Sequence, residues 1–391
     1  APLPGLYLPA GYEARFREGR FAGLEPRPGF PERVERQWVH DLAPHPTHSR
    51  FLTPETVFRD MPLLEPSRGC PHPCRFCTAG YADNPPRHHP LARLLGEAEA
   101  ARPHTRRVGL VAPSPGDHPA FGDLVARLVA QGFEVSPSSI RIDHLTPEVV
   151  ELLVRSGNRS LTLAPEGGSD HLRGVISKGF TEAQILAAAE ALAAAGLHRV
   201  KLYLMVGLPE ETEADVAAAG ELVAAVRDRF LPHWRRAGRA GSITVSLNQL
   251  VPKPHTPFQW EGLAPFETVA ARIAALRARL EPLGNVRLDT DPPLTVAVEA
   301  ALSRGDRRAA DLLLAAARDR GRWRRALPAW LAATGTDLHA PLDPKAPLPW
   351  SHVATGLITP YLAREAHRAR LAKVSRPCPP DLVGCHKCGI C

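Results

Sequence analysis

Short apolar segments alternate with helical stretches from residue 56 to about residue 290, and this alternation limits the fold more than any other feature. Apolar strands spaced by helices indicate a parallel sheet, because each helix returns the chain to the same end of the sheet by a right-handed crossover. Six such units form an α/β barrel or partial barrel, whose functional side chains collect at the carboxyl ends of the strands. The predicted strands are Met61–Glu65, Arg107–Ala112, Glu134–Arg141, Ser160–Ala164, Arg199–Val206, Ser242–Leu250 and Val286–Leu288.

Two flanking segments differ from this pattern. Residues 1–55 are rich in Pro, Gly, Arg and aromatic residues without a sustained period, so we expect an N-terminal arm or linker. Residues 291–391 predict a mostly helical C-terminal extension that ends in a cysteine-rich motif. Because the chain starts with Ala1 rather than Met, we expect further sequence upstream. No apolar stretch reaches the ~18 residues that span a bilayer, so we predict no membrane partner.

Three of the seven cysteines lie close together after the first predicted strand. Cys70, Cys74 and Cys77 have the spacing C-x3-C-x2-C in a loop rich in proline and glycine. Three thiolates at this spacing suit an iron–sulfur cluster with one open iron, since such clusters are usually held by four ligands. A loop of free thiols and part of a zinc site are the alternatives. Cysteines in two clusters, without a secretory signal, indicate metal ligation in a reducing cytoplasm rather than a disulfide framework.

The same spacing, with Phe76 before the third cysteine, resembles the signature of the radical S-adenosylmethionine (SAM) superfamily. The resemblance implies a partial (β/α)6 barrel of the TIM type, with a [4Fe-4S] cluster on the three cysteines and SAM on the open iron. It also implies reductive cleavage of SAM to a 5′-deoxyadenosyl radical, with the electron supplied by a reductant such as flavodoxin or ferredoxin.

Several further segments resemble a bacterial radical SAM family of poorly assigned function. They are Leu-Glu-x-Ser-Arg-Gly-Cys, Ala-Pro-Glu-x-Gly-Ser, Ser-Arg-Gly-Asp-Arg-Arg and Leu-Pro-Trp. Members of that family often carry a cobalamin-binding domain upstream. Residues 1–55 are too short for such a domain, so a bound cobalamin would need sequence outside this chain.

The segments after the predicted strands carry the residues to which the resemblance assigns SAM contacts. The Gly-Gly-Glu of the family is absent after the second strand, where Ser114, Gly116 or Asp117 could replace it. Glu166 and Lys178 match the residues that hold the ribose and carboxylate of SAM. The predicted cofactor-binding residues are Phe76, Gly116, Arg141, Glu166, Ser169, Lys178, Gly207 and Val251.

These segments also have structural alternatives. Arg141 could form a salt bridge with Asp143, and the glycines after Glu166 could make a turn that caps a helix. Lys201 alternates with apolar neighbours on the fifth strand, while Lys253 and His255 lie on a proline-rich loop after the sixth. We predict substrate contacts for these three residues. A structural role for the loop is the alternative, and the sequence assigns no catalytic residue.

The chain ends in a second cysteine group, with the spacing C-x6-C-x2-C-x2-C. Its members are Cys378, Cys385, Cys388 and Cys391. Four thiolates predict a second metal site, and the C-x2-C-x2-C part resembles iron–sulfur loops of the ferredoxin type. We favour an auxiliary [4Fe-4S] cluster, with a structural zinc ion as the alternative.

The charge of the chain bears on its substrate. The net charge is +7 and the isoelectric point is about 9.2, which favours an anionic partner such as RNA. A basic surface without a binding role is the alternative. We predict a transferase that methylates or methylthiolates RNA or a ribosomal component. The alternatives are modification of a small metabolite or peptide and, in another class, a metal-stabilised nucleic-acid-binding protein without catalysis.

Overall fold

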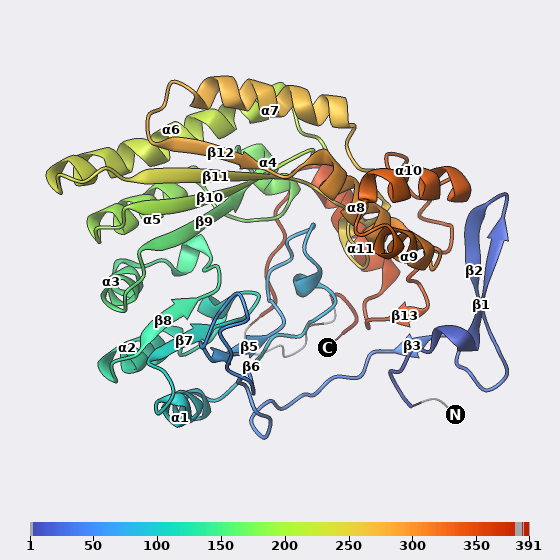
Figure 1. The fold of residues 1–391 in the computed structure, drawn as a ribbon, viewed down its shortest axis with the longest axis horizontal. Coiled ribbons are helices and arrows are strands. Elements are labelled where there is room, and N and C mark those ends of the chain that lie inside the picture. Colours follow the sequence, from blue (N-terminus) through green and yellow to red (C-terminus); the bar gives the residue numbers. More distant parts are fainter. Residues whose placement is uncertain (1–2, 380–384, 386, 391) are drawn as a thin grey trace.

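The computed structural model describes residues 3–379, 385 and 387–390, and parallel strands in chain order form its central wall (Figure 1). One parallel sheet contains β4 (Leu63–Leu64), β7 (Arg107–Leu110) and β8 (Glu134–Pro137). A second contains β9 (Ser160–Glu166), β10 (Arg199–Val206), β11 (Ser242–Gln249) and β12 (Val286–Thr290). The predicted α/β partial barrel is thus confirmed, and its wall consists of two parallel sheets.

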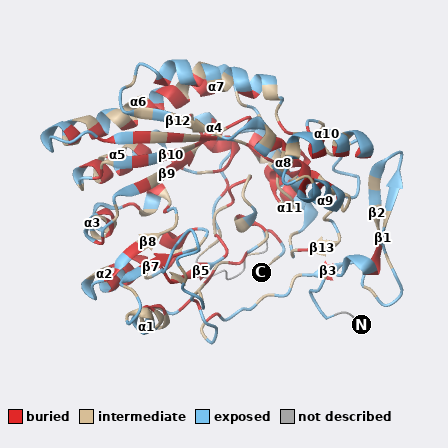
Figure 2. Ribbon diagram, in the orientation of Figure 1, coloured by how far each residue is buried: buried red, intermediate tan, exposed pale blue. Residues whose placement is uncertain are grey.

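Helices cover one face of each sheet, and the core lies beneath them (Figures 1 and 2). On β10, Val200 and Leu202 are buried among residues of the covering helices, whereas Lys201 between them is exposed on the opposite face. This alternation follows from the two-residue repeat of a strand. The covering helices are α1 (Leu91–Ala101), α2 (Phe121–Ala130), α3 (Pro147–Arg155), α5 (Glu182–Ala194), α6 (Glu213–Arg236) and α7 (Phe266–Leu280).

The helix ends follow local sequence signals. The sequence predicts a capping box, because Thr181 is followed three residues later by Gln184, and the two residues form one at the start of α5. Gly196 follows the end of this helix with φ +84°. The sequence predicts a helix over Ala214–Arg229, but this prediction was wrong at the C-terminus, because α6 continues past Pro232 to Arg236. The Trp234 indole donates a hydrogen bond to the carbonyl oxygen of Leu197 at 3.1 Å, and this contact anchors the added turns.

The N-terminal arm contains strands that the sequence did not predict. After a short 3-10 helix, η1 (Pro9–Gly11), β1 (Tyr12–Arg17) and β2 (Arg20–Pro26) form an antiparallel hairpin. The next strand, β3 (Val34–Glu35), pairs in parallel with β13 (Val353–Ala354) of the C-terminal region. The arm therefore packs against the other end of the chain.

The C-terminal region is mostly helical and has its own core. Its helices are α8 (Pro293–Arg304), α9 (Ala309–Arg318), α10 (Trp323–Thr334) and α11 (Thr359–Arg370). Trp330 is buried in the core shared by the first three, and its indole donates to the carbonyl oxygen of Arg308 at 2.8 Å. Among the described residues, no helix is both long and apolar enough to cross a membrane.

Candidate functional site

The three-cysteine loop leaves the barrel wall directly after β4. It lies between β5 (Ser67–Arg68) and β6 (Arg87–His88), which pair antiparallel and close its base. Gly69 begins the loop with φ +83°, and a Cβ there would lie 2.5 Å from the carbonyl oxygen of Asp83. A short 3-10 helix, η2 (Thr78–Gly80), follows the third cysteine. The sequence therefore places the cysteines at the carboxyl end of a strand, where barrel sites lie.

Two of the three cysteines of this loop are buried, and Cys77 is partly buried. Cys70 and Cys74 are 8% and 7% exposed, and burial raises the pKa of Cys70 to about 12. Burial also raises the pKa of Cys77, against the nearby positive charge of Lys178. Because burial disfavours the charged thiolate, a bound cation would favour ionisation of Cys70 and Cys77.

The spacing of the thiols bears on the kind of metal centre. Within the described residues, one group of three metal-ligating side chains has all its ligand atoms within 4.8 Å of one another, and that group contains no cysteine. At least two of the three sulfurs thus lie more than 4.8 Å apart, beyond the ~3.8 Å expected around one tetrahedral zinc ion. A cluster places each cysteine on a separate iron. The loop therefore fits the [4Fe-4S] cluster that its spacing predicts better than a single ion.

A charged and aromatic corner adjoins the cysteine loop. The Lys178 ammonium lies 3.7 Å from a carboxylate oxygen of Glu166 and 5.9 Å from the ring centre of Phe76. The Arg141 guanidinium stacks over Phe180 at 4.5 Å and lies 3.1 Å from Asp143. The structure thus brings together Phe76, Arg141, Glu166 and Lys178, four of the predicted cofactor-binding residues.

Glu166 has an unusual backbone and environment. It ends β9 with φ +64°, a left-handed conformation that is uncommon outside glycine and that often marks functional sites. Burial raises the pKa of its carboxyl group, while the charge of Lys178 and a hydrogen bond from it oppose the rise. Such a carboxylate can accept hydrogen bonds from the hydroxyl groups of a ligand in place of its contact with the Lys178 ammonium.

The remaining predicted cofactor residues have local structural partners. Ser169 caps α4 (Asp170–Val175) and its hydroxyl also bonds to Asp215. Gly207 follows β10 with φ +74° and donates its N–H to Glu211 at 2.6 Å. Gly116 packs against the ring of His144, and Val251 is buried in the core of the C-terminal helices. Their cofactor contacts stay predictions.

The predicted substrate residues are dispersed. Lys201 is exposed on β10, and Lys253 is paired with Glu299 of α8. His255 lines a cavity of about 220 Å³ with Gln259, Trp260 and Trp350. Burial and the nearby His352 lower the pKa of His255 to about 4, so its imidazole is neutral at pH 7. These three side chains therefore do not form one cluster, and their substrate contacts stay predictions.

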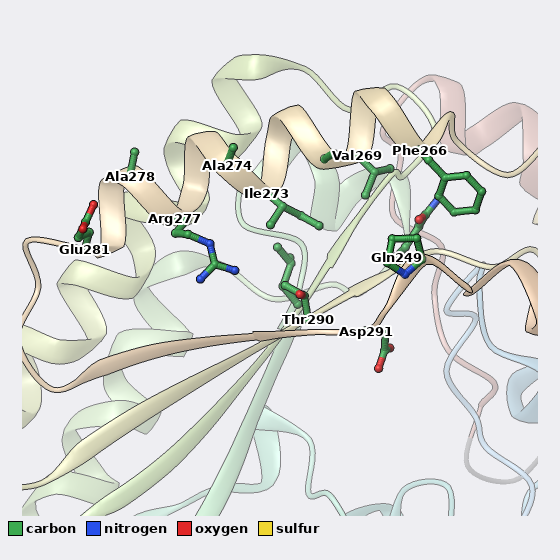
Figure 3. Close-up of a pocket in the computed structure, with 13 residues that line it drawn as sticks. Gln249, Phe266, Val269, Ile273, Ala274, Arg277, Ala278, Glu281, Thr290 and Asp291 are labelled. Atoms are coloured by element: carbon green, nitrogen blue, oxygen red, sulfur yellow. The ribbon is translucent and has the colours of Figure 1, made fainter. Parts of the chain in front are cut away.

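A larger hollow of about 510 Å³ lies between α7 and the end of the β11–β12 pair (Figure 3). Val269 and Ile273 of α7 give it an apolar wall, and Arg277 and Glu281 lie toward one end. The hollow is on the face of the sheet that α7 covers. It is separate from the cysteine loop.

The second cysteine group lies against the first. The backbone N–H of Cys378 donates to the carbonyl oxygen of Pro71 in the cysteine loop at 2.8 Å. Tyr361 of α11 faces both Cys378 and Cys388, whose charges contribute, after burial and Glu365, to raising its pKa. The Tyr361 ring lies 6.2 Å from that of Tyr81, which follows η2. Cys385 is partly buried, and Cys391 lies outside the described residues.

Arg75, between the second and third cysteines, joins the loop to the C-terminal tail. Its side chain is fully buried and donates to the carbonyl oxygens of Gly174 and Val175 at 2.8 and 2.7 Å. It also donates to the carbonyl oxygen of Lys373 at 2.5 Å and lies 3.2 Å from Glu365. Sequence reasoning missed this residue, because an arginine beside a cysteine motif gives no signal of burial.

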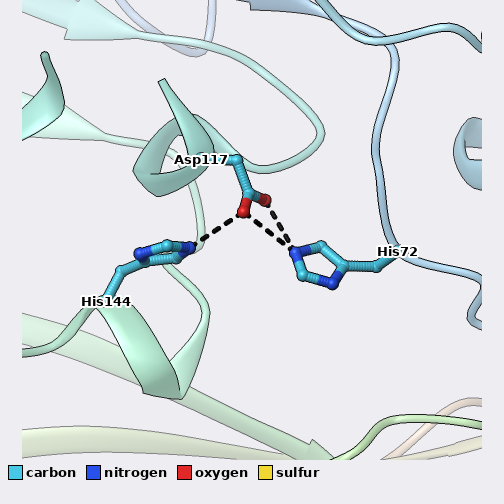
Figure 4. Close-up of side chains that lie close together, drawn as sticks. All are labelled: His72, Asp117 and His144. Carbon is cyan, nitrogen blue, oxygen red and sulfur yellow. Dashed lines mark hydrogen bonds and ion pairs between the residues drawn. The ribbon is translucent and has the colours of Figure 1, made fainter. Parts of the chain in front are cut away.

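Sequence reasoning also missed a polar cluster beside the loop (Figure 4). His72, between the first two cysteines, lies 2.9 Å from the carboxylate of Asp117, and His144 lies 3.0 Å from the same carboxylate. Burial alone would raise the pKa of Asp117, but hydrogen bonds with His144 and His72 hold it well below its usual range. Asp117, one candidate for the missing Gly-Gly-Glu, is thus occupied by two imidazoles.

Comparisons with known proteins agree with the family resemblance that the cysteine spacing indicates. Residues 64–223 match the family model of the Radical SAM superfamily. The chain is 37% identical over 201 residues to the uncharacterized protein MJ0966 of Methanocaldococcus jannaschii. That match covers 51% of this chain and 42% of the relative, so the chain spans less than half of that protein.

Two solved structures have a distant overall likeness. The radical SAM methyltransferase TsrM from Kitasatospora setae has a TM-score of 0.46 at 15% identity, over 70% of this chain and 60% of that one. The coproporphyrinogen III oxidase HemN from Escherichia coli has a TM-score of 0.39 at 14% identity, over 59% and 56%. At these values, neither likeness bears on the reaction. The family match covers the cysteine loop and the Glu166–Lys178 corner, and residues 64–223 therefore form a domain of the radical SAM superfamily.

Proposed function

We propose that this chain is a radical SAM enzyme, which binds a [4Fe-4S] cluster through Cys70, Cys74 and Cys77 and cleaves SAM reductively. The observation that carries the proposal is the position of the Glu166–Lys178 pair and Phe76 beside these cysteines. When bound and reduced, the cluster supplies the electron that breaks a carbon–sulfur bond of SAM, giving methionine and a 5′-deoxyadenosyl radical. A one-electron donor such as flavodoxin or ferredoxin replenishes that electron.

The residues of the corner position SAM in this proposal. The Lys178 ammonium pairs with the carboxylate of SAM, and Glu166 accepts hydrogen bonds from its ribose hydroxyls. The Arg141 guanidinium, which already stacks over Phe180, adds a second cation to the same corner. The buried environment strengthens these interactions because little water competes with them. The protein thus binds, orients and excludes water, while the cofactor supplies the chemistry.

Anaerobic reconstitution tests this proposal. The wild-type chain, loaded with iron and sulfide and mixed with SAM and dithionite, is expected to release 5′-deoxyadenosine. Cys74→Ala is expected to release none, whereas His104→Ala, at an exposed position after α1, should match the wild type. Absence of 5′-deoxyadenosine from the wild type, or equal amounts from Cys74→Ala, contradicts the proposal.

We propose a second metal centre at the C-terminal cysteines, with an auxiliary [4Fe-4S] cluster favoured over zinc. The contact between Cys378 and Pro71 supports this proposal, because it brings the tail to the first cysteine loop. Metal counts on the isolated chain separate the cases. At the cysteines, eight irons per chain indicate two clusters, and four irons with one zinc indicate a structural zinc ion. Cys385→Ala identifies the metal of the tail, because it should lose four irons relative to the wild type in the first case and one zinc in the second. Zinc alone contradicts the radical SAM proposal as a whole.

For the substrate, we propose RNA or a ribosomal component, modified by methylation or methylthiolation. The observation that favours a nucleic acid is the net charge of +7. Binding of tRNA or rRNA that weakens steeply with salt supports it, since phosphate contacts release counterions. Absence of such binding favours a small metabolite or a peptide. Unchanged RNA binding after loss of both metal centres, with no SAM cleavage, would favour a non-catalytic binding protein.

A further inference from the structure

Three side chains from three separate segments converge on one point beside the cysteine loop (Figure 4). His72 lies in the loop itself, Asp117 ends η3 (Pro115–Asp117) and His144 ends η4 (Ile142–His144). The Nε2 atoms of both imidazoles lie 3.0 Å from the same oxygen, Oδ1 of Asp117. One ligand atom from each residue lies within 4.8 Å of the others. The convergence thus presents two nitrogens and one oxygen toward a shared centre.

The spacing of these atoms suits a single ion. An ion about 2.1 Å from each of two neighbouring octahedral ligands holds those ligands about 3.0 Å apart. The two nitrogen–oxygen distances in the cluster equal that value, so a small rotation of the imidazole rings would let an ion replace the shared protons. The side chains of His72 and Asp117 are 13% and 15% exposed and that of His144 is 30% exposed, so the site is sheltered yet reachable.

The position in the fold is one where functional sites gather. The two short helices that carry Asp117 and His144 follow β7 and β8, at the carboxyl ends of parallel strands. Gly116 permits the approach of His144, because a Cβ at residue 116 would lie 2.7 Å from its imidazole ring. A larger residue there would separate the two ligands. The glycine therefore allows His144 to lie close to Asp117.

We propose that His72, Asp117 and His144 bind one divalent transition-metal ion, Fe²⁺ or Zn²⁺, distinct from both cysteine groups. Two imidazoles and one carboxylate are a ligand set that both ions accept, and three protein ligands leave coordination positions open. The open positions can bind water or a small anionic ligand next to the cysteine loop. This site goes beyond the proposed SAM chemistry, since it requires neither the cluster nor SAM.

Zinc binding to the full chain tests the site directly. The cluster-loaded chain is treated with EDTA, desalted and dialysed anaerobically against Zn²⁺, and zinc per chain is counted by mass spectrometry. The wild type is expected to bind one zinc more than either His144→Ala or Asp117→Asn. Asp117→Asn keeps one acceptor oxygen and the side-chain shape, so it removes the charged ligand with little effect on folding. His171→Ala is the matched control. His171 also pairs with an aspartate, Asp215, but it belongs to no group of three metal-ligating side chains among the described residues. This variant should therefore bind as much zinc as the wild type.

Two more measurements complete the test. Co²⁺ bound at this site should give the weak visible absorption of nitrogen and oxygen ligands, and that absorption should be lost in both variants. Metal counts are also compared between the wild type and His144→Ala as isolated from cells. The metal that the variant lacks identifies the resident ion as iron or zinc. Equal zinc counts in the wild type and both variants, or cobalt spectra that show thiolate ligands alone, would overturn the proposal. Loss of SAM cleavage alone bears on the proposed function and leaves this count unaffected.

Discussion

The buried Arg75–Glu365 pair offers a prediction whose size follows from the structure. Both side chains are almost fully buried, and Glu365 also accepts a hydrogen bond from Ser375 at 2.6 Å. Arg75→Met removes the cation but leaves the carboxylate in place. Breaking a buried pair in this way costs about 3–5 kcal/mol, because the remaining carboxylate is not solvated. The partly exposed Arg368, 3.8 Å from Glu365, stays in place, so the loss should lie toward the lower end of that range.

This cost converts to a measurable change in melting temperature. A chain of this length has an unfolding entropy of about 0.8 kcal/mol per kelvin, so Arg75→Met should lower Tm by about 4–6 °C. Scanning calorimetry on chains with the same metal content measures the shift. Arg127→Met is the control, since its pair with Asp123 is exposed and should contribute less than about 1 kcal/mol.

A double variant separates the buried charge from the lost packing. Arg75→Met combined with Glu365→Leu leaves no unpaired charge, so it should melt at least about 2 °C above Arg75→Met alone. Recovery will be partial, because the carbonyl oxygens of Gly174, Val175 and Lys373 still lack their donor. The reasoning is refuted if Arg75→Met shifts Tm by less than 1 °C, or if the double variant is less stable than the single one.

Three further predictions concern the SAM corner, the tail and pH. Lys178→Met should weaken SAM binding at least tenfold in equilibrium dialysis, about 1.4 kcal/mol, because the cation facing the SAM carboxylate is lost. Gly174→Ala should destabilise the chain by about 1–3 kcal/mol in urea unfolding, because its Cβ would lie 2.3 Å from the backbone oxygen of Ala372. His255, whose pKa is lowered to about 4 by burial and His352, stays unprotonated in the folded chain. The unfolded chain takes up that proton first as pH falls from about 6.5 to 4, so stability is lost across this range and His255→Asn should reduce the loss.

Each of these predictions has a matched control. Lys345→Met removes an exposed lysine from a loop of the C-terminal region and should leave SAM binding unchanged. Gly96→Ala lies within α1, where a Cβ meets nothing within 4 Å, so it should stabilise the chain. Asn tolerates the φ of +57° at residue 255, so the pH comparison is free of added strain. Equal SAM affinities for Lys178→Met and Lys345→Met, or equal pH profiles for wild type and His255→Asn, would contradict the respective argument.

The regular elements of the barrel were predictable because their signals are local. The strand at Arg199–Val206 and the capping box at Thr181 each depend on residues a few positions apart. The N-terminal hairpin was missed because β1 and β2 have mixed, largely exposed residues without a two-residue period. The last turns of α6 were missed because Pro232 normally ends a helix, and a tertiary contact of Trp234 outweighs it here.

The candidate site was predictable in parts but not as an arrangement. The cysteine spacing and the residues after the strands identify Phe76, Glu166 and Lys178 one by one. Their proximity depends on which strand ends lie next to each other. The parallel topology predicts that these ends share one edge of the barrel, but not which side chains come into contact. The cluster of His72, Asp117 and His144 has no such signal, because its members are 45 and 27 residues apart and share no motif. Only the folded chain brings them together.

Hydrogen bonds and a buried ion pair join the two cysteine groups, so metal binding at one group affects the other. The tail bonds to the first loop through Cys378 and Pro71, and Arg75 inside the first motif bonds to Lys373 and Glu365 of the tail region. A metal centre that orders one group therefore removes conformational freedom from the other. The second centre then binds to a chain that has already lost this entropy, so the two centres should load cooperatively. Arg75→Met should weaken that cooperativity even at temperatures where the chain stays folded.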